Sequence, residues 1–283
     1  MPVLNQANTN TCGTFASTTA AEMLLFGGNH QFSITQSLQL GSSLSQTNKL
    51  LPAIRAEIFK YNLNSFINPW NGTYPGLVLT QFYNYGMDKT VDGDDRNGTF
   101  SEKNKTIKLK NTASFTKFNF FKKQLFWAGR GEAPAKHVNN IKKAIDKGGF
   151  VVINVLMFSS YGNDGMSAKL YPRKLGNKMI CSYPDISGTS GVYNVWYYRP
   201  ELSQMLKKAD SLPPEQSDKI CSGHIMTIIG YQNYSNRPNE GVFIVRNSWG
   251  ADNGDNGNNY IDYDYFKAFG LEAVVISDQP LAN

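Results

Sequence analysis

The stretch HIMTIIGYQNYSNRPNEGVFIVRN, residues 224–247, decides how the second half of this chain folds. Two apolar, β-rich runs flank the segment QNYSNRPNE, whose Asn, Ser and Pro residues favour a turn. The stretch therefore predicts an antiparallel hairpin. A turn centred near Ser235 and Asn236 pairs residue 224 with residue 247. His224 and Asn247 should then face each other, and a carboxamide so placed can fix the orientation and tautomer of an imidazole.

A cysteine near the start of the chain is the group that such an imidazole could activate. Cys12 opens the run CGTFASTTAAEMLLFGG, in which apolar side chains recur at helical spacing until Gly27 and Gly28 end the pattern. The run predicts a helix that begins at Cys12. A helix N-terminus favours a thiolate, which is the nucleophilic form of cysteine.

Each of these features also has an ordinary interpretation. A single Cys near a helix start is often a small buried apolar residue. A His at a strand end is often a hydrogen-bonded structural residue, and NSWG, residues 247–250, could be a simple turn. Together, however, the features indicate a nucleophile, a base and an orienting amide.

Five motifs, in order along nearly the whole chain, resemble those of papain-like (cathepsin-like) cysteine proteases. The first is Gln6 followed by Cys12, an aromatic residue and Ser17. FSITQSLQL resembles the family's Leu-Ser-Glu-Gln segment, and NGTYPGLVLTQFYNYGM its substrate-binding stretch with the helix that follows. SGHIMTIIGY is similar to the histidine motif. VRNSWGADNGDNGNNYIDYDYF is similar to the Asn-Ser-Trp-Gly motif with its Gly-rich continuation, which is the most specific match.

This resemblance implies an α+β, papain-like fold of two lobes. A helical N-terminal lobe would carry the nucleophile, and a β-barrel-like C-terminal lobe the His and Asn, with the active-site cleft between them. We expect residues 1–283 to form a single peptidase domain. The mainly helical lobe would span 1–135 and the β-rich lobe 136–283, the latter including an insertion at about 159–219.

The resemblance also implies a role for each matching residue. Cys12 would be the nucleophile, paired as a thiolate with the imidazolium of His224, which returns a proton to the leaving amine. Asn247 would hold His224, and Trp249 would cover that hydrogen bond. The Gln6 amide and the Cys12 backbone N–H would form the oxyanion hole. The expected substrate-binding residues are Gly72, Thr73, Tyr74, Pro75 and Trp249.

The chain departs from the family pattern at several positions. Gly13 follows the nucleophile where the family usually has Trp, and Thr73 replaces the second Gly of a Gly-Gly pair. Thr9 stands where the family usually has a disulfide cysteine. His224 lies 212 residues after Cys12, beyond the usual range of about 130–150. Most of the excess falls in the 159–219 insertion, which either shapes substrate binding or is peripheral.

The pattern of apolar residues predicts further elements. Helices are expected at about 48–60 and 77–85, in HVNNIKKAIDKG and in PELSQMLKKAD, and a strand in FVVINVLMF. Residues 86–135 are expected to be loops with one or two exposed strands, one of them EKNKTIKLKN, residues 102–111.

Composition excludes several classes of function. The charge of +6 comes from scattered lysines without interleaved aromatic residues, so we expect no nucleic acid partner. No apolar run is long enough to cross a bilayer, so we expect no membrane partner. Neither a metal nor an organic cofactor is expected, and we expect a monomer.

Of the three cysteines, Cys181 and Cys221 would form the disulfide if the compartment is oxidising. The opening MPVLNQ has no signal-peptide pattern, so any signal or pro-segment is absent or trimmed; we expect an exported protein.

The sequence therefore predicts a thiol-dependent peptidase that hydrolyses peptide or protein substrates through an acyl-enzyme on Cys12. Two alternatives stay open. One is a non-catalytic papain-like binding module, suggested by Gly13 and Thr73. The other is a selective thiol hydrolase or acyltransferase that acts on a ubiquitin-like tail or another specific protein.

Overall fold

The computed structural model describes residues 3–29, 32–46, 68–89, 100–127, 132–158, 200–217, 221–234 and 237–281, with short pieces between 174 and 198. Several expectations lie outside the described residues. These are the helix at about 48–60, the hairpin turn at 235–236, Cys181 and its possible disulfide, and most of the 159–219 insertion.

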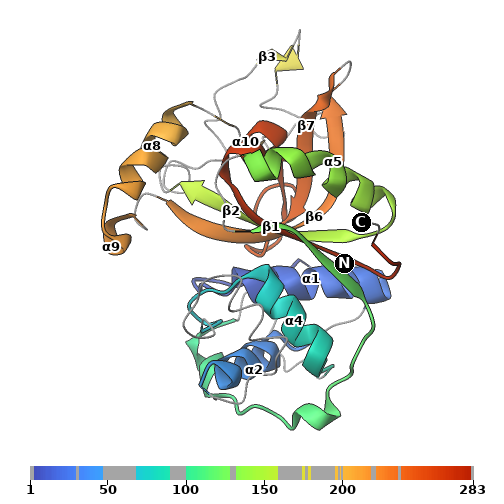
Figure 1. Ribbon diagram of the computed structural model, residues 1–283. Helices are drawn as coiled ribbons and strands as arrows, with labels where there is room; N and C mark the ends of the chain where they lie inside the picture. Colours follow the sequence, from blue (N-terminus) through green and yellow to red (C-terminus); the bar gives the residue numbers. More distant parts are fainter. Residues whose placement is uncertain are drawn as a thin grey trace.

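Helices from the first half of the chain form one lobe, which lies below the sheet in Figure 1. The lobe contains α1 (Cys12–Phe26), α2 (Ile34–Gln46), α4 (Pro75–Tyr85) and the 3₁₀ helices η1 (Glu102–Thr106) and η2 (Thr112–Ser114). The start and end expected for α1 are confirmed. Gly27 adopts the left-handed conformation with φ 58° and closes the helix by donating to the Glu22 and Met23 carbonyls.

The expected exposed strand at residues 102–111 is wrong. Its first half is the 3₁₀ helix η1, because Ser101 and Asn104 form a capping box that satisfies the N–H groups at the helix start. The alternating Lys pattern suggested a strand, but this local side-chain to backbone hydrogen bonding decides the conformation.

The second lobe is built on a seven-stranded sheet in the order β1-β9-β2-β6-β7-β8-β5. Its strands are β1 (Phe121–Trp127), β2 (Phe150–Phe158), β5 (Val195–Trp196), β6 (Cys221–Tyr234), β7 (Arg237–Arg246), β8 (Asn258–Asp262) and β9 (Gly270–Ser277). All described pairings in it are antiparallel except that of β5 with β8. The sheet is open rather than closed into a barrel, with β1 and β5 at its edges. Strand β1 comes from the segment expected in the helical lobe, yet it pairs with β9.

The remaining elements decorate the sheet. They are α5 (Glu132–Asp146), α8 (Pro200–Asp210), α9 (Pro214–Ser217), α10 (Tyr263–Phe269) and the two-residue strands β3 (Lys174–Leu175) and β4 (Lys178–Met179). Helices α5 and α10 cover the face of the sheet opposite to α1, and α8 and α9 extend to one side (Figure 1).

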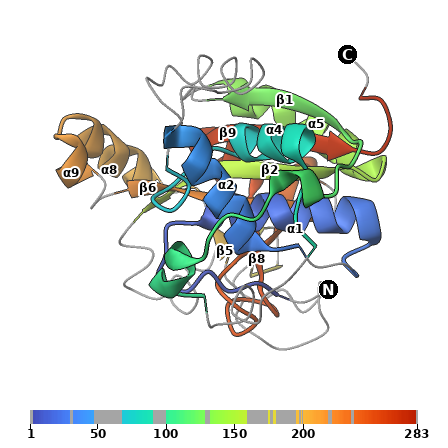
Figure 2. The same ribbon diagram turned by 90° about the horizontal axis from the view of Figure 1, so that it is seen from below.

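Each face of the sheet packs against its own hydrophobic core. Along β2, Val151 and Ile153 point into the core beneath α5 and α10, whereas Val152 points toward α1 and Cys12. The same alternation in β9 sends Val275 one way and Val274 the other. Helices α1 and α4 lie against the second face and α2 packs on α1 and α4, as the view from below shows in projection (Figure 2). The sheet therefore contributes to the cores of both lobes, and the residues that surround Cys12 lie on its α1 face.

The predicted hairpin is present, but its register differs from the prediction. Beside the turn, Tyr234 pairs with Arg237, as predicted. Two irregularities then shift the ladder, so that Thr227 pairs with Arg246 at the open end. His224 instead pairs with Val155 of β2. The expected backbone pairing of residues 224 and 247 is therefore wrong, because bulges insert unpaired residues that the hydrophobic pattern does not reveal.

Candidate functional site

The beginning of the chain is bound to the segment that follows β7. The backbone N–H of Gln6 donates to the Ser248 carbonyl at 2.8 Å, and that of Gly250 donates to the Leu4 carbonyl at 3.0 Å. Asn5 and Trp249 form an antiparallel bridge between these two bonds. The predicted site residues Gln6 and Trp249 are therefore brought together from opposite ends of the chain.

The thiol of Cys12 lies beside the histidine strand. Cys12 is the first residue of α1, and its side chain is 9% exposed. Helix α1 is fixed to β6 by a hydrogen bond from Thr227 Oγ1 to the Ala16 carbonyl at 2.7 Å. The backbone N–H groups of Ile225, Gly13 and Cys12 itself act to lower the pKa of the Cys12 thiol, and Cys12 packs in the same core as Ile225. The candidate nucleophile therefore contacts the residue that follows the candidate base.

The side chains of His224 and Asn247 meet although their backbones are not paired. His224 Nε2 lies 2.9 Å from Asn247 Oδ1. The Asn247 Nδ2 points the other way, toward Asn253 Oδ1 at 3.4 Å and Asn259 Oδ1 at 3.5 Å. Because Asn247 presents its oxygen to the ring, Nε2 must carry the hydrogen, and Nδ1 is the nitrogen able to accept a proton. Asn253 and Asn259 thus hold the side chain of Asn247 in the orientation that it presents to His224.

Sequence reasoning treated the Gly-rich tail only as a continuation of the Asn-Ser-Trp-Gly motif and assigned no role to these two asparagines. The signal for them is the run DNGDNGNN, residues 252–259, in which several Asn side chains follow the Asn-Ser-Trp-Gly motif closely. Asn259 is fully buried and also donates to Asn253 Oδ1 at 2.7 Å. The tail therefore folds into a small amide network around Asn247.

Two tryptophan rings lie near the imidazole. Trp249 stacks on His224 with ring centroids 4.5 Å apart and an interplanar angle of 26°. Trp196 lies 6.1 Å from His224 and packs edge-on against Tyr265. Trp196 comes from β5, in a region without a periodic pattern of apolar residues, so sequence reasoning missed it. These rings leave His224 only 4% exposed.

Burial shifts the pKa values of both reactive side chains toward their uncharged forms. It lowers the pKa of His224 to about 4, although the hydrogen bond with Asn247 acts in the opposite direction. Burial raises the pKa of the Cys12 thiol above its ordinary value, against the effect of the backbone N–H groups. The resting pair favoured by this environment is a neutral thiol and a neutral imidazole. This differs from the thiolate that the helix N-terminus alone predicts.

Gln6 is buried in a turn held by hydrogen bonds. Its Nε2 donates to the Thr9 carbonyl at 2.5 Å, and its Oε1 accepts from Ser248 Oγ at 2.5 Å. Thr9 Oγ1 in turn donates a hydrogen bond to the Gln6 carbonyl at 2.6 Å. Thr9 therefore contributes to the shape of this turn through its hydroxyl group, at the position where the family usually has a disulfide cysteine. A carboxamide nitrogen has a second hydrogen that could serve an oxyanion.

Four of the five expected substrate-binding residues, 72–75, lie directly before and at the start of α4, whereas Trp249 lies on the His224 ring. Tyr74 is the N-cap and Pro75 the first helical residue, while Gly72 has φ 120°, which favours glycine. A side chain at Gly13 would place its Cβ 2.7 Å from Thr73 Cγ2. The two departures from the family pattern therefore fit each other: the methyl group of Thr73 occupies the space that a larger residue 13 would need.

Adding a methyl group at residue 13 tests this fit. Gly13→Ala is expected to lower the free energy of unfolding by about 1–2 kcal/mol, because its Cβ crowds Thr73. Thr73→Ser removes that methyl group and keeps the hydroxyl. In this background Gly13→Ala should be neutral or stabilise by up to about 1 kcal/mol, because alanine favours a helix more than glycine does. Urea unfolding of the four proteins measures the coupling, and an equal cost in both backgrounds would contradict it.

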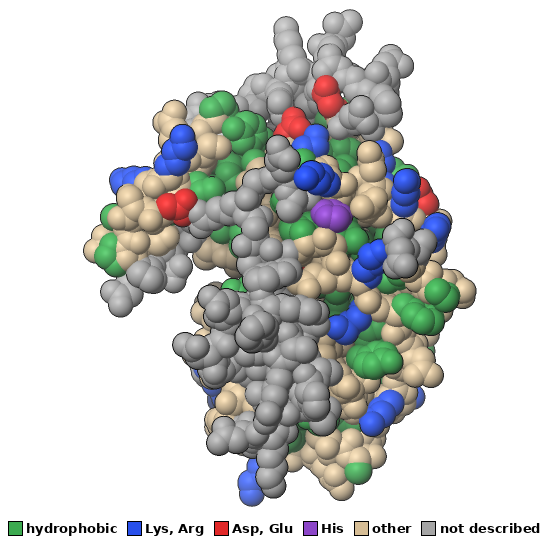
Figure 3. Space-filling model, in the orientation of Figure 1, with side chains coloured by type: hydrophobic (Ala, Val, Ile, Leu, Met, Phe, Trp, Pro, Cys, Tyr) green, Lys and Arg blue, Asp and Glu red, His purple; other side chains and the backbone are tan. Residues whose placement is uncertain are grey.

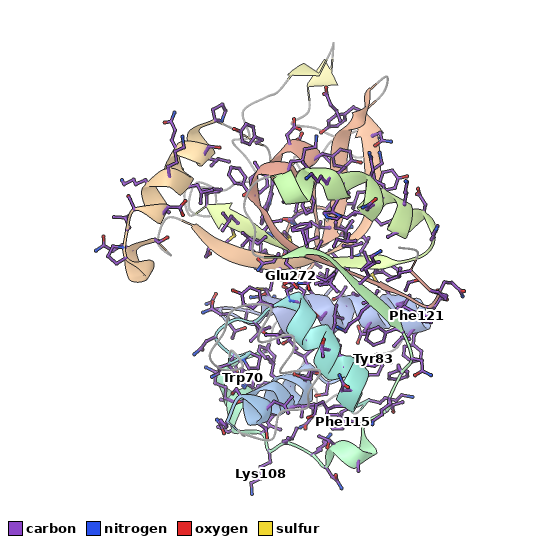
Figure 4. All side chains as sticks on the ribbon, viewed as in Figure 1. Trp70, Tyr83, Lys108, Phe115, Phe121 and Glu272 are labelled. Carbon is purple, nitrogen blue, oxygen red and sulfur yellow. The ribbon has the colours of Figure 1, made fainter. Side chains whose placement is uncertain are left out.

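A buried carboxylate, missed by sequence reasoning, joins the two lobes. Glu272 of β9 is fully buried and accepts from the Gly76 N–H at the start of α4, 3.1 Å away. Figure 4 shows Glu272 where α4 meets the sheet. Its charge also contributes, after burial, to a raised pKa of Tyr74. The negative charge at this helix N-terminus is favourable, so Glu272 holds the segment before α4 in place.

A second buried polar group lies opposite Glu272 in the sheet. Asn154 of β2 pairs with Glu272 on one side and with Ile225 on the other. Directly paired residues share a face, so Asn154 and Glu272 lie on the α1 face with Ile225. Asn154 Oδ1 is buried and has no hydrogen-bond partner among the described residues. The sheet face beside Cys12 is therefore polar at two adjacent positions.

Within the residues that the structure describes, no three His, Cys, Asp or Glu side chains gather into a group that could hold a metal ion. None of the described helices combines the length and apolar character needed to cross a membrane.

Known proteins share this architecture. Residues 188–281 match the model of the Peptidase C1-like family, and no curated protein sequence matches the chain. Xylellain, a cysteine protease from Xylella fastidiosa, superposes with a TM-score of 0.54 at 12% identity, over 99% of this chain and 84% of that one. The clostridial cysteine protease Cwp84 after propeptide cleavage superposes with a TM-score of 0.54 at 16% identity, over 99% of this chain and 56% of that one. Procathepsin L 3 of Tenebrio molitor larval midgut superposes with a TM-score of 0.50 at 12% identity, over 98% of this chain and 66% of that one.

Proposed function

We propose that this chain, which has the fold of papain-like cysteine proteases, is itself a cysteine-type peptidase that hydrolyses peptide bonds through an acyl-enzyme. The observation that supports this most is the imidazole of His224. It is oriented by Asn247 at 2.9 Å and covered by Trp249. It belongs to the residue before Ile225, which packs in the same core as Cys12 and whose backbone N–H acts to lower the pKa of the Cys12 thiol. A nucleophile, a base and an orienting group so arranged are the requirement of nucleophilic catalysis.

The pKa directions indicate how the first step would proceed. Because the resting thiol and imidazole are both neutral, the Cys12 proton would move to His224 Nδ1 as the sulfur attacks the carbonyl carbon. The carbonyl oxygen would become an oxyanion that accepts from the Gln6 amide and the Cys12 backbone N–H. When the intermediate collapses, the C–N bond breaks and the leaving amine takes the proton from Nδ1. The product is a thioester on Cys12.

The second step would reverse the proton movements. A water molecule gives a proton to His224 Nδ1 and attacks the thioester carbon, and the C–S bond breaks. The released sulfur recovers the proton, which regenerates the neutral pair. Throughout, Asn247 accepts from Nε2–H, so the ring keeps the orientation in which Nδ1 carries out both transfers.

Substrate would lie along the segment before α4. Gly72 and Thr73 would offer backbone groups to an extended peptide, and Tyr74 and Pro75 would wall the pocket for the second residue before the cleavage point. A single peptidase domain over residues 1–283 is part of this proposal. Export and a monomeric state, both expected from the sequence, stay predictions.

One observation favours the second candidate, a non-catalytic binding module. Burial of Cys12 raises the pKa of its thiol, and a thiol without an assembled base would be inert. The two candidates differ in whether His224 can take the proton of Cys12, which an alkylation experiment can measure.

The test follows peptide cleavage while Cys12 is alkylated. The native protein is incubated with a mixture of unstructured synthetic peptides, and products are identified by mass spectrometry. Substoichiometric iodoacetamide is then added in steps, and the labelled cysteine is mapped. We expect the loss of cleavage to parallel labelling of Cys12, and peptide substrate to slow that labelling. Cleavage that persists after Cys12 is fully labelled would overturn the proposal. So would a folded protein that cleaves no peptide and whose Cys12 reacts no faster than a free model thiol.

A further inference from the structure

A second concave site lies on the α5 side of the sheet. A cavity of about 410 Å³ opens between β1, α5 and the segment after β9. We call it the α5 groove, defined by Lys123 and Leu125 of β1, His137 and Lys143 of α5, Lys147, and Leu281. Its volume falls within the range of about 300–1,000 Å³ that small-molecule sites occupy.

The α5 groove is electropositive. Three lysines, Lys123, Lys143 and Lys147, line it together with His137, and the described residues that line it include no Asp or Glu. Burial lowers the pKa of His137, and the charges of Lys123 and Lys136 lower it further. A histidine shows among Lys and Arg side chains on the face drawn in Figure 3. An anion is the ligand that such a field attracts.

The walls of the α5 groove are partly apolar. Leu125, Ala144, Val275 and Leu281 contribute hydrocarbon surface between the cationic groups. His137 lies in a fixed position, with its ring stacked on Phe126 at a centroid distance of 5.6 Å and an interplanar angle of 25°. A bare inorganic anion would leave the apolar wall uncovered. The lining matches a molecule with both an apolar body and an anionic head.

His137 can offer a hydrogen bond to such a head group. Its Nδ1 lies 3.3 Å from Asn140 Nδ2. An amide nitrogen can only donate, so in this arrangement Nδ1 accepts and the neutral ring carries its hydrogen on Nε2. His137 therefore supplies an N–H donor next to the lysine ammonium groups even when it is uncharged.

The α5 groove and Cys12 lie on opposite faces of the sheet. Val275 packs in the core beneath α5, whereas its neighbours Val274 and Ile276 pack in the core that contains Cys12. A ligand in the groove would therefore not compete with a peptide at Cys12. Binding in the α5 groove would not require that the chain is a peptidase.

We propose that the α5 groove is a binding site for a small organic anion that carries an apolar body, with a carboxylate, sulfonate or phosphate as its head group. The apolar body lies against Leu125, Ala144 and Leu281. The head group lies among Lys143, Lys147 and the Nε2–H of His137.

Three probes separate the contributions of charge and hydrocarbon. Naphthalene-1-sulfonate has both an anionic head and an apolar body, inorganic sulfate has only the charge, and 1-naphthalenemethanol has only the apolar body. Binding is followed by the imidazole NMR signals of the native protein, which contains three histidines. The His137 signals are assigned with His137→Gln. We expect naphthalene-1-sulfonate to shift them saturably and to raise the pKa of His137, because an anion offsets the nearby lysines. The two partial probes should bind much more weakly.

Adjacent lysines on α5 provide a matched control. Lys143→Gln combined with Lys147→Gln is expected to weaken binding of naphthalene-1-sulfonate roughly fivefold, from two partly exposed ion pairs. Lys142→Gln removes one charge from the same helix, but Lys142 Nζ bonds Asn233 at 2.9 Å and lies over Tyr231, away from the groove. That variant should bind nearly as the parent does.

Several outcomes would overturn the proposal. One is that naphthalene-1-sulfonate leaves the His137 signals unchanged. A second is that sulfate or 1-naphthalenemethanol binds as tightly as the complete probe, because the site would then recognise charge alone or hydrocarbon alone. A third is that Lys142→Gln weakens binding as much as the double variant, which would indicate only the general positive charge of the chain. None of these outcomes bears on peptide cleavage.

Discussion

Replacing either Cys12 or His224 with alanine is expected to lower kcat/KM for peptide cleavage by on the order of 10⁴-fold or more. The variant with both changes should be no slower than the worse single variant, because a nucleophile and its base act as a unit. In the proposed mechanism Cys12 supplies the attacking sulfur and His224 takes its proton, so either change alone removes the same step. Initial rates on one defined peptide, measured for all three variants, test this.

The pH dependence of the parent should identify the same imidazole. A general base must be unprotonated, and burial lowers the pKa of His224 to about 4. Activity is therefore expected to rise as the pH increases through about 4. It should be complete well below 6.5, the ordinary pKa of histidine. His137→Ala is the matched control, because it removes an imidazole outside the site and should leave both the rate and the pH profile unchanged. If His224→Ala kept more than a tenth of the parent rate, His224 would not be the base.

Gly254→Ala is expected to destabilise the fold by about 2–4 kcal/mol, the sum of a left-handed backbone penalty and severe crowding. Gly254 has φ 64°, and a Cβ there would overlap the Asn258 carbonyl oxygen and lie 2.8 Å from Asn259 Nδ2. The melting temperature should fall by about 5–10 °C. Because Asn259 and Asn253 hold Asn247, the variant should also lose activity at temperatures where it is still folded. Calorimetry and the peptide assay measure the two effects.

Gly27 provides the control for the backbone penalty. It has a similar φ of 58°, and a Cβ there would meet nothing within 4 Å. Gly27→Ala should therefore cost about 1–2 kcal/mol, from conformation alone, and leave activity unchanged. The difference between the two variants is the cost of crowding in the amide network. If Gly254→Ala cost no more than Gly27→Ala, the tail around Asn247 would be looser than the structure indicates.

The contact between His224 and Asn247 was predictable although the register was not. The turn residues and the apolar runs on both sides define the hairpin, and they place both residues at its open end. The ladder is then shifted by bulges, one of them beside Gly241, whose φ of 159° lets the backbone approach Gln232 closely. Nothing in the alternation of apolar residues marks such a shift. The side chains meet because the chain leaves the sheet at Asn247 and turns back.

Other parts of the site depend on contacts that no local pattern encodes. Glu272 meets Gly76 across 196 positions of sequence, and from sequence it was one more polar residue near a strand. Trp196 belongs to a two-residue strand, too short for any periodicity. The opposing shifts in the pKa values of Cys12 and His224 result from burial by distant elements, whereas sequence reasoning considered only the helix N-terminus. Residues within a motif were predictable, and their long-range environment was not.

The backbone bonds between Leu4–Gln6 and Ser248–Gly250 have a consequence for biosynthesis. A ribosome releases the chain from its amino end, so Cys12 and Gln6 emerge long before Asn247 is translated. Until residues 248–250 leave the exit tunnel, the Gln6 turn has only its local hydrogen bonds with Thr9 and lacks those with Ser248. The nascent polypeptide therefore carries the Cys12 thiol before the proposed base has its orienting partner Asn247. The proposed site would assemble only after translation has passed residue 250, when Leu4–Gln6 pairs with Ser248–Gly250.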